Sequence, residues 1–555
     1  MDTKLLNTSL LAYFHFGLLF LIFSIFSLLK INSLSWILPI SFLVLSLFSI
    51  ISLKTIWPFI FYLAVFILSI IISYVFFDMS YDGKAYHQSA IYHLSKDFNP
   101  YFDILSKKDT QYYTYINHYP KVFEIVSSSI YAFTDKIQTA KCFNLIFIFS
   151  NIIIGFFLIK ECLGFNKLLT SIFSLIIALN PVVISQICTF YVDGFMYSTI
   201  VALIYAILLR VKNTSTLINI SIFLLSVILC NIKFTSLVYF FIIFFSATGL
   251  FLLYNDKKSF SFILKNGILT IVLGIAFLGY NPYVKNYKAG NHIFYPIYGE
   301  KKIDIITHVS PTEFKGKNRF EKFSISFFGE TGNGANTSNI SASEQKRIKL
   351  KIPFSVSEKE IPFLKHPDIR ISGFGPYFSG ITLLVLLGLI ISLFKKKYTT
   401  TEKTLCLIMM SLIFSSVINP EFWWARFTPQ LWLVPIVIMM ILYLNRKLII
   451  LKYFSIIAIS LISLNIFLFL KTNFIYNIKS SLRIAKNLNI LKKSKQTIYI
   501  YQDTFETDFL KFSENGIQYE ITTSPTVAKY KNSLFGEMTI YQNNKDIHTL
   551  LDNIN

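Results

Sequence analysis

The stretch with the most chemical potential covers residues 76–102 and reads FFDMSYDGKAYHQSAIYHLSKDFNPYF. It carries two carboxylates, Asp78 and Asp82, at the point where an apolar run gives way to polar sequence. A helix that begins near Asp82 places Tyr86 one turn further along, with His87 beside it. Asp82 then either caps this helix or acts as a general base, and the pattern alone leaves both interpretations open.

A third acid, Asp193, lies in the stretch NPVVISQICTFYVDGFMYS, residues 180–198, between two further apolar runs. A carboxylate so close to a bilayer is costly unless it faces a cavity or a partner. Asp82 and Asp193 could therefore converge on one cavity, where one accepts a proton and the other holds the substrate or a metal. The alternative for Asp193 is a helix-capping role in a short turn.

Three basic residues lie at the same predicted outer boundary: Lys233 in NIKFTS, Lys285 in NPYVKNYK and Arg426 in NPEFWWARF. Basic residues in this position run against the positive-inside rule. A lipid phosphate would explain them, because arginine presents a planar fork matched to phosphate and lysine a mobile point charge. Snorkelling is an equal alternative for Arg426. For Trp423 and Trp424 an interfacial aromatic belt is favoured over a sugar-stacking platform.

The segment NHYPKVFE is a weaker candidate, in which His118 and Tyr119 could line the acceptor side. A lone histidine in a loop is more often simply solvated. The sequence contains no G-x-S-x-G elbow, P-loop, H-E-x-x-H or Rossmann glycine pattern, so hydrolysis of nucleoside triphosphates and nicotinamide chemistry lose support.

The composition indicates which elements must position these residues. The chain has 555 residues, of which 54% are hydrophobic and 15% charged, and its mean hydropathy is +0.56. A soluble protein carries about 25% charged residues, so a multi-domain cytosolic enzyme is excluded. The net charge of +22 would suggest nucleic acid, but the basic residues punctuate apolar runs, which is the pattern of membrane topology. No nucleic-acid partner is expected.

The positions of the cysteines argue against a fold stabilised by disulfides or by a bound metal. All five cysteines lie in or beside apolar runs, without C-x-x-C spacing. Neither a disulfide framework nor a zinc site is indicated.

The apolar runs predict an all-α polytopic membrane protein with about thirteen spans. The runs begin near Leu10, Trp36, Ile56, Thr139, Leu168, Phe195, Leu217, Ser236, Ile263, Tyr377, Thr404, Thr428 and Ile449. If the N-terminus is cytoplasmic, every short inward turn is basic, as the positive-inside rule requires. Two long loops, residues 78–138 and 281–375, then lie on the non-cytoplasmic side, and the C-terminus lies there as well.

Two domains are expected: a membrane module over residues 1–470 and a tail over residues 471–555. The tail has β-like runs at residues 497–501 and 517–521 around a short helical pattern, which favours a small α/β appendage. Residues 329–343, rich in Gly, Asn, Ser and Thr, are expected to form a mobile lid or linker.

In order and topology these segments resemble the GT-C class of multi-spanning membrane glycosyltransferases, which includes protein mannosyltransferases and lipid A aminoarabinose transferases. The resemblance covers most of residues 78–430. Its motifs are Asp78 with D-G-x-x-Y-H (Asp82, Gly83, Tyr86, His87), Y-V-D-G (191–194), K-F-T (233–235), N-P-Y-x-x-N with F-Y-P (281–286 and 294–296) and W-W-A-R-F (423–427).

The resemblance implies transfer of a sugar from a polyprenyl-phosphate donor, usually with inversion. The acceptor would be a cell-envelope glycan, lipid or protein on the non-cytoplasmic face of a bacterial-type inner membrane. In such enzymes an acid of the first outer loop is the expected base, which here means Asp82 or Asp78. The usual adjacent acidic pair is absent, because Met79 follows Asp78 and Gly83 follows Asp82. The choice therefore stays open, the cofactor stays unknown, and a divalent metal is conceivable although no metal ligand is assigned.

The resulting hypothesis assigns three sets of residues. Catalytic roles go to Asp82, Asp78 and Asp193. Cations that stabilise the departing donor phosphate are Arg426, Lys233 and Lys285. Substrate-binding residues are Tyr86, His87, His118, Tyr119, Asn281 and Tyr283.

Two other classes compete with this hypothesis. An O-antigen polymerase or ligase also has many spans and a large outer loop, and it relies on outer-loop arginines, which this chain offers as Arg319, Arg347 and Arg370. A transporter of lipid-linked sugars would place ionisable residues at mid-membrane and show symmetry between two halves, and the sequence favours neither feature.

Overall fold

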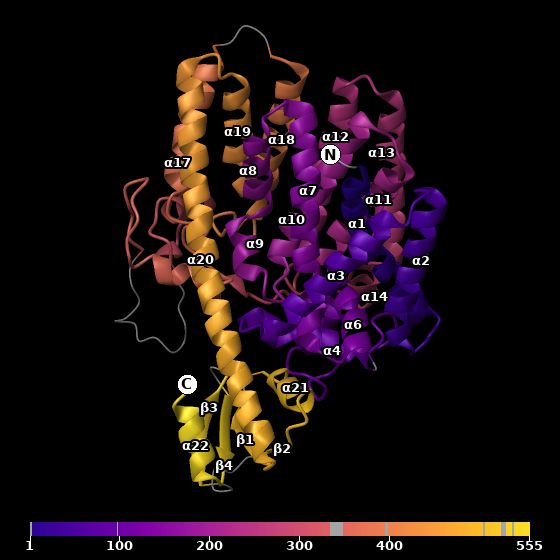
Figure 1. Cartoon of the computed structure of the whole chain (residues 1–555), viewed down its shortest axis with the longest axis vertical. Coiled ribbons are helices and arrows are strands. Elements are labelled where there is room, and N and C mark those ends of the chain that lie inside the picture. Colours follow the sequence, from indigo (N-terminus) through magenta and orange to yellow (C-terminus); the bar gives the residue numbers. More distant parts are fainter. Residues whose placement is uncertain are drawn as a thin grey trace.

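The computed structural model describes residues 3–96, 98–332, 348–394, 398–502, 505–522, 529–535 and 538–554. This part of the chain is mostly helical, with one small sheet near the C-terminus (Figure 1). Most of the segment 329–343, which was expected to be mobile, lies outside the described residues, as does Arg347.

Nine helices in the described ranges are long and apolar enough to cross a membrane, which is typical of a polytopic membrane protein. They are Thr3–Leu28 (α1), Leu34–Ser52 (ending in α2, Ile37–Ser52), Trp57–Val75 (α3), Ile137–Leu163 (ending in α7, Phe143–Leu163), Asp193–Lys212 (α10), Phe234–Leu253 (α12), Lys257–Phe277 (beginning with α13, Lys257–Leu269), Thr400–Val417 (α18) and Ile449–Ser494 (α20). Each coincides with a predicted span, so the polytopic helical architecture is confirmed.

The four other predicted spans coincide with shorter apolar helices. These are α8 (Lys167–Ala178), α11 (Thr216–Ile232), α17 (Phe378–Ser392) and Pro429–Leu444, which ends in α19 (Leu433–Leu444). A further short apolar helix, α6 (Val122–Thr134), lies within the first long loop. The total of thirteen spans therefore stays a prediction.

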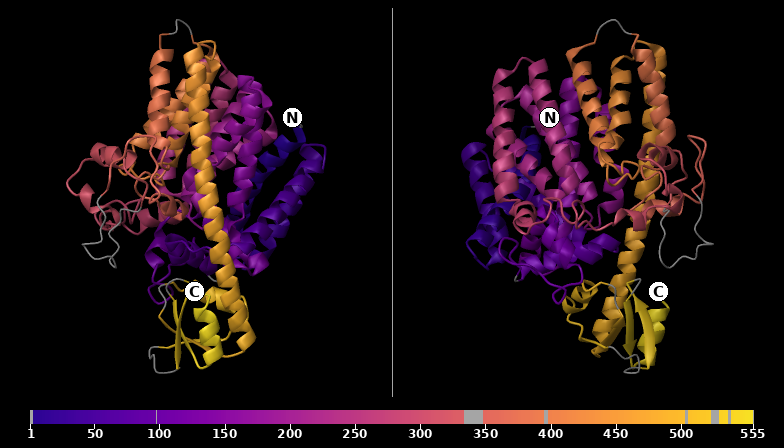
Figure 2. Two further views of the ribbon diagram at one scale, coloured as in Figure 1. Left: turned by 60° about the vertical axis from the view of Figure 1, so that its left-hand side comes forward. Right: turned by 180° about the vertical axis from the view of Figure 1, so that it is seen from behind.

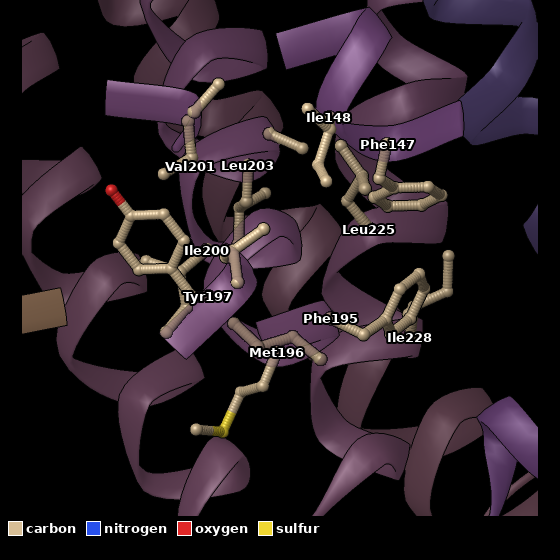
Figure 3. Packing of buried hydrophobic residues seen from close by; sticks show 14 of the residues in the cluster. Phe147, Ile148, Phe195, Met196, Tyr197, Ile200, Val201, Leu203, Leu225 and Ile228 are labelled. Atoms are coloured by element: carbon tan, nitrogen blue, oxygen red, sulfur yellow. The ribbon is translucent and has the colours of Figure 1, made fainter. Parts of the chain in front are cut away.

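Helix α10 forms the centre of the bundle. It is apolar on all sides, and a helix of that kind is stable only when neighbours surround it. Figure 3 shows Phe195 of α10 near Phe147 of α7 and Ile228 of α11, and the ring centroids of Phe147 and Phe195 are 4.6 Å apart. This packing fixes the N-terminal residue of α10, Asp193, at the end of the bundle where the first long loop lies.

The long loops are built from short helices. The first contains one turn of π-helix, Gly83–His87, which continues directly into α4 (Gln88–Ser95), followed by α5 (Tyr113–His118) and α6. The second contains Tyr280–Val284 and α14 (Lys285–Lys288), then α15 (Ile306–Val309), α16 (Arg319–Phe327) and the turn Ile361–Lys365. Between α8 and α10 lies the short helix α9 (Pro181–Gln186).

The predicted domain boundary at residue 470 falls inside α20, which runs without interruption from the bundle into the C-terminal domain (Figures 1 and 2). Helix α20 continues past residue 470 because its apolar residues keep a helical spacing. Ile484, Leu488 and Leu491 recur at helical intervals and pack in the core of the C-terminal domain. The rigid connection makes the C-terminal domain an extension of the last span.

The small α/β C-terminal domain agrees with the expectation for the tail. Its sheet has the order β2-β1-β4-β3, in which β1 pairs parallel with β2 and antiparallel with β4. The elements are β1 (Ile498–Gln502), α21 (Asp508–Ser513), β2 (Tyr519–Ile521), β3 (Tyr530–Leu534), β4 (Met538–Gln542) and α22 (Lys545–Asp552).

Candidate active site

The guanidinium of Arg426, in the loop between α18 and α19, lies among three carboxylates. Its Nη1 is 2.9 Å from Oδ2 of Asp82, and its Nε is 3.5 Å from Oδ1 of Asp368 and 4.0 Å from Oδ2 of Asp193. The ammonium of Lys233, at the start of α12, lies 2.6 Å from the other oxygen of Asp193. We call these five residues, which come from five separate segments, the Arg426 cluster.

The Arg426 cluster is partly open to solvent. Its three carboxylates face its own two cations and also Arg370, whose Nη2 lies 3.5 Å from Oδ2 of Asp368. The side chains of Asp82 and Asp368 are each 19% exposed and that of Lys233 is 23% exposed, whereas Asp193 is only 2% exposed. A ligand can therefore reach Asp82, Asp368 and Lys233. Asp193 is buried behind them and pairs with Lys233.

The electrostatics of the cluster fix the charge of Arg426. Burial lowers the pKa of Arg426, but the carboxylates of Asp368, Asp82 and Asp193 outweigh burial and raise this pKa well above its usual value. Burial raises the pKa of Asp368, and the cations Arg426 and Arg370 oppose that shift only in part. The carboxyl group of Asp368, in the second loop, therefore takes up a proton more readily than that of an ordinary aspartate.

Aromatic rings pack against the Arg426 cluster. The guanidinium of Arg426 lies 4.8 Å from the ring centroid of Trp424 and 5.1 Å from that of Tyr191. The rings of Trp423 and Trp424 are both buried and stack at 5.2 Å, which differs from the exposed interfacial belt favoured by the sequence. Arg426 thus contacts the Trp424 ring and the carboxylates of the cluster, and these contacts rather than snorkelling explain its position.

The first-loop acids have different surroundings. The carboxylate of Asp82 is directed to Arg426 rather than to the backbone N–H groups of the turn that follows it. Asp78 is fully buried, and its carboxylate accepts hydrogen bonds from the backbone N–H of Ser80 at 2.8 Å and of Phe190 at 2.9 Å. A Cβ at Gly83 would lie 2.0 Å from Asp78 Oδ2, so the glycine lets the loop close over this carboxylate. Asp78 holds the loop, and Asp82 faces the cluster.

Two of the predicted substrate-binding residues border the cluster and a third lies just behind it. The Tyr86 ring contacts the rings of Tyr119 at 6.1 Å and His87 at 4.3 Å between centroids. Tyr86 and Tyr119 are close enough to Asp82 and Arg426 for those charges to act on the pKa values of both phenols, which burial raises above their usual value. His87 is buried, and its Nδ1 pairs with the carboxylate of Glu124 in α6.

The remaining predicted residues are not brought to the cluster. They form a junction between the two long loops, in which His118 Nδ1 lies 2.7 Å from the Asn286 side-chain oxygen. Asn281 donates to the Pro100 carbonyl at 2.9 Å, and Lys285 donates to the same carbonyl at 3.3 Å. The Tyr283 hydroxyl donates to the carbonyl of Cys230 at the end of α11. These side chains mostly bind backbone carbonyls and hold the loops together.

An apolar groove between α10, α12 and α18 begins beside the cluster. The space of about 540 Å³ not filled by atoms there includes the open space outside the groove. Its lining includes Ile200, Ile204, Tyr239, Ile243, Ile408 and Leu412. The Tyr239 hydroxyl donates to the carbonyl of Phe427, the residue after Arg426. From Tyr239 to Leu250 the lining residues of α12 extend over roughly 16 Å of helix.

Sequence reasoning missed Asp368. It lies in the segment KHPDIR of the second loop, where no hydrophobic periodicity marks a position. A usable signal was present, because Asp368 stands two residues before a basic residue, Arg370, and ten residues before the start of α17. An acid so close to the end of an apolar run has the same positional character as Asp82 and Asp193.

Within the described ranges, no group of three or more His, Cys, Asp or Glu side chains is arranged to hold a metal ion. Comparison of the chain with protein-family models, with curated proteins and with solved structures finds no match. The chemistry of the site itself therefore carries the functional argument.

Proposed function

We propose that the protein is a membrane glycosyltransferase that moves a sugar from a polyprenyl-phosphate donor to an acceptor on the non-cytoplasmic face of the membrane. The acceptor would be a cell-envelope glycan, lipid or protein. The proposal includes a cytoplasmic N-terminus, so that the Arg426 cluster, both long loops and the C-terminal domain share the outer side.

The observation that carries the proposal is the adjacency of the Arg426 cluster and the apolar groove. A ligand that fills both must have a long apolar part and a charged head. A polyprenyl phosphate has this form, and its phosphate cannot leave the membrane boundary. Lys233 stands between the two features, because it pairs with Asp193 in the cluster and begins the helix α12 that lines the groove.

The proposed reaction gives each side chain a separate task. The Asp82 carboxylate accepts the proton of an acceptor hydroxyl, and the freed oxygen bonds to the anomeric carbon of the sugar. The bond from that carbon to the phosphate oxygen breaks, and its electron pair stays on the phosphate. Attack from the face opposite to the leaving group inverts the anomeric centre.

Cations near the departing phosphate lower the barrier because charge develops there in the transition state. Lys233 is the more exposed of the two cations in the cluster and suits this role. Arg426 is the more deeply held, and its contacts to Asp82, Asp193 and Asp368 suit it to orient the carboxylates as well. Lys285, bound to backbone carbonyls in the loop junction, is left out of the phosphate site.

One observation favours a second candidate, an O-antigen polymerase or ligase. The guanidinium of Arg370 lies 5.2 Å from the ring of Trp424, which Arg426 also contacts, so an outer-loop arginine borders the cluster. The donors distinguish the two candidates. A glycosyltransferase of the proposed kind uses one sugar on a lipid phosphate, and the polymerase or ligase uses an oligosaccharide on a lipid diphosphate.

The test incubates the purified protein in lipid nanodiscs with a panel of polyprenyl-phosphate sugars and a lipid-diphosphate oligosaccharide, and measures release of the free lipid carrier. Wild type is compared with Asp82→Asn and with a matched control, Asp103→Asn, an exposed acid of the same loop. We expect release of polyprenyl phosphate by wild type and by the control, and loss of release in Asp82→Asn. Turnover of the lipid-diphosphate donor alone would replace the proposal with the second candidate.

A further inference from the structure

The C-terminal domain contacts the segment of the first loop that carries Asp82. The ammonium of Lys84, two residues after Asp82, lies 2.7 Å from Oδ2 of Asp508 at the start of α21. Asp508 also pairs with Lys511 one turn along the same helix. We call Lys84, Asp508 and Lys511 the Asp508 cluster; all three side chains are almost completely buried.

The residues just before α21 hold the same segment at further points. Thr507 donates its hydroxyl hydrogen to the backbone carbonyl of Lys84 at 2.7 Å. The ring of Phe505 lies 4.4 Å from the Lys84 ammonium and packs edge-on against Tyr81, the residue before Asp82, at 5.2 Å. The residues on both sides of Asp82 are therefore held by the stretch 505–508.

A third set of contacts anchors the helix that follows. The carboxylate of Glu506 accepts hydrogen bonds from the hydroxyls of Ser89, in α4, and Thr110, the latter at 2.6 Å. The backbone N–H of Phe77 donates to the Ser481 hydroxyl in α20 at 3.0 Å. Anchoring by the C-terminal domain and its supporting helix thus begins before Asp82 and continues past it, and Asp82 itself is the residue that turns to Arg426.

We infer that Asp508 is a positioning residue, and that the C-terminal domain works as a clamp that holds the Asp82 segment so that its carboxylate meets Arg426 and the substrate. The catalytic part of this inference rests on the proposed function. A misplacement of about 1 Å can cost ~100-fold in rate, so a clamp of this kind acts on the rate of the chemical step rather than on binding of the donor.

The test compares wild type with Asp508→Asn and with a matched control in the same domain, Asp546→Asn, whose residue is exposed in α22. Two quantities are measured on the full chain in nanodiscs: hydrogen exchange of the amides in residues 81–89, and kcat and KM for the donor. We expect Asp508→Asn to speed exchange in residues 81–89 and to lower kcat by roughly 10- to 100-fold, with donor KM nearly unchanged. Asp546→Asn should match wild type in both.

A second variant covers the case in which Asp508→Asn does not fold. Thr507→Val keeps the ion pairs and the shape of the side chain and removes one hydrogen bond to Lys84, so the same two changes are expected at smaller size. Exchange and kcat at wild-type values in the folded variants would overturn the inference and leave the proposed function standing. If wild type turns over none of the donors, the proposed function fails, and unchanged exchange in residues 81–89 would then overturn the clamp as well.

Discussion

Two ion clusters meet beside one short turn of helix, Gly83–His87, and they differ in access to solvent. The Arg426 cluster, joined to this turn through Asp82, has three carboxylates and two cations, and three of its side chains are about a fifth exposed. The Asp508 cluster, joined to it through Lys84, has one carboxylate and two cations, with side-chain exposures of 0%, 3% and 1%.

The difference in solvent access indicates that the Asp508 cluster has a structural role and the Arg426 cluster a chemical role. An ion cluster that is closed to solvent offers a ligand no place, so its value lies in the geometry that it imposes. An ion cluster that is partly open to solvent can accept a proton or a charged ligand. Side chains two residues apart on the same turn therefore have different tasks, and the following experiments either break this contrast or sharpen it.

The largest effect on activity is expected for Asp82→Asn. The amide cannot accept a proton, so kcat should fall by about 10²- to 10⁴-fold while the protein keeps its thermal stability. Asp78→Asn should show the reverse pattern, with a lower unfolding temperature, because Asp78 accepts two backbone N–H groups in a buried site. Turnover and thermal unfolding, measured on the same preparations, check both. Equal losses of activity and stability in the two variants would contradict the assignment.

A large loss of stability is expected for Arg426→Met. This variant leaves Asp82 without its ion-pair partner and brings three carboxylates together with only Lys233 and Arg370 nearby as cations, which is expected to cost about 3 to 5 kcal/mol. Adding Asp368→Asn should recover part of the loss by removing one of the repelling charges. Thermal unfolding of the single and double variants measures the coupling, and strictly additive effects would show that Asp368 and Arg426 do not interact.

A moderate effect is expected for Lys233→Met. Loss of one charge-assisted contact to the donor phosphate corresponds to a fall of about 10- to 100-fold in kcat/KM. Lys285→Met, which changes the same residue type in the loop junction, should leave kcat/KM near the wild-type value. Steady-state kinetics with the donor distinguish the two lysines, and a larger loss in Lys285→Met would return the phosphate site to the loop junction.

The smallest effect concerns the seam between the C-terminal domain and the first loop. Glu514, after α21, accepts a hydrogen bond from the backbone N–H of Ile137 at 2.8 Å. Burial raises the pKa of Glu514 from 4.5 to about 7, against the opposing influence of that N–H group and of the cations Lys136 and Lys511, while Asp135 adds to the rise. The folded state thus binds more protons than the unfolded state between these two pH values.

The sign follows from proton linkage: this group makes the folded state less stable as pH rises from 4.5 to about 7. Glu514→Gln should remove that contribution, so its unfolding temperature should fall less than that of wild type between pH 5 and pH 7.5. Identical pH dependence in the two proteins would show that Glu514 does not titrate in this range.

The residues of the Arg426 cluster could be predicted from the sequence better than the contacts between them. Asp82, Asp193, Lys233 and Arg426 could be selected because each follows or precedes an apolar run, and the ends of neighbouring spans on one side of a membrane must lie at one level. The same rule could not separate Asp78 from Asp82, because their difference lies in which backbone N–H groups fold over the carboxylate. Lys285 was selected for its charge, and only the tertiary structure shows that it binds the first loop.

The remaining failures have a common cause in long-range contacts. Asp368 and Asp508 lie in irregular or short elements, and each meets a partner dozens to hundreds of residues away. No local period or cap signals such a contact. The boundary expected at residue 470 falls inside α20 for a related reason. Hydropathy falls near that residue, while the helical spacing of Ile484, Leu488 and Leu491 continues.

The most direct test of the central claim is a structure of the protein with a non-hydrolysable polyprenyl-phosphonate sugar. The account predicts the phosphonate within about 4 Å of the Lys233 ammonium, the sugar beside Asp82, and the prenyl chain in the groove between α10, α12 and α18. A lipid bound elsewhere, with the Arg426 cluster unchanged and the groove unfilled, would contradict it.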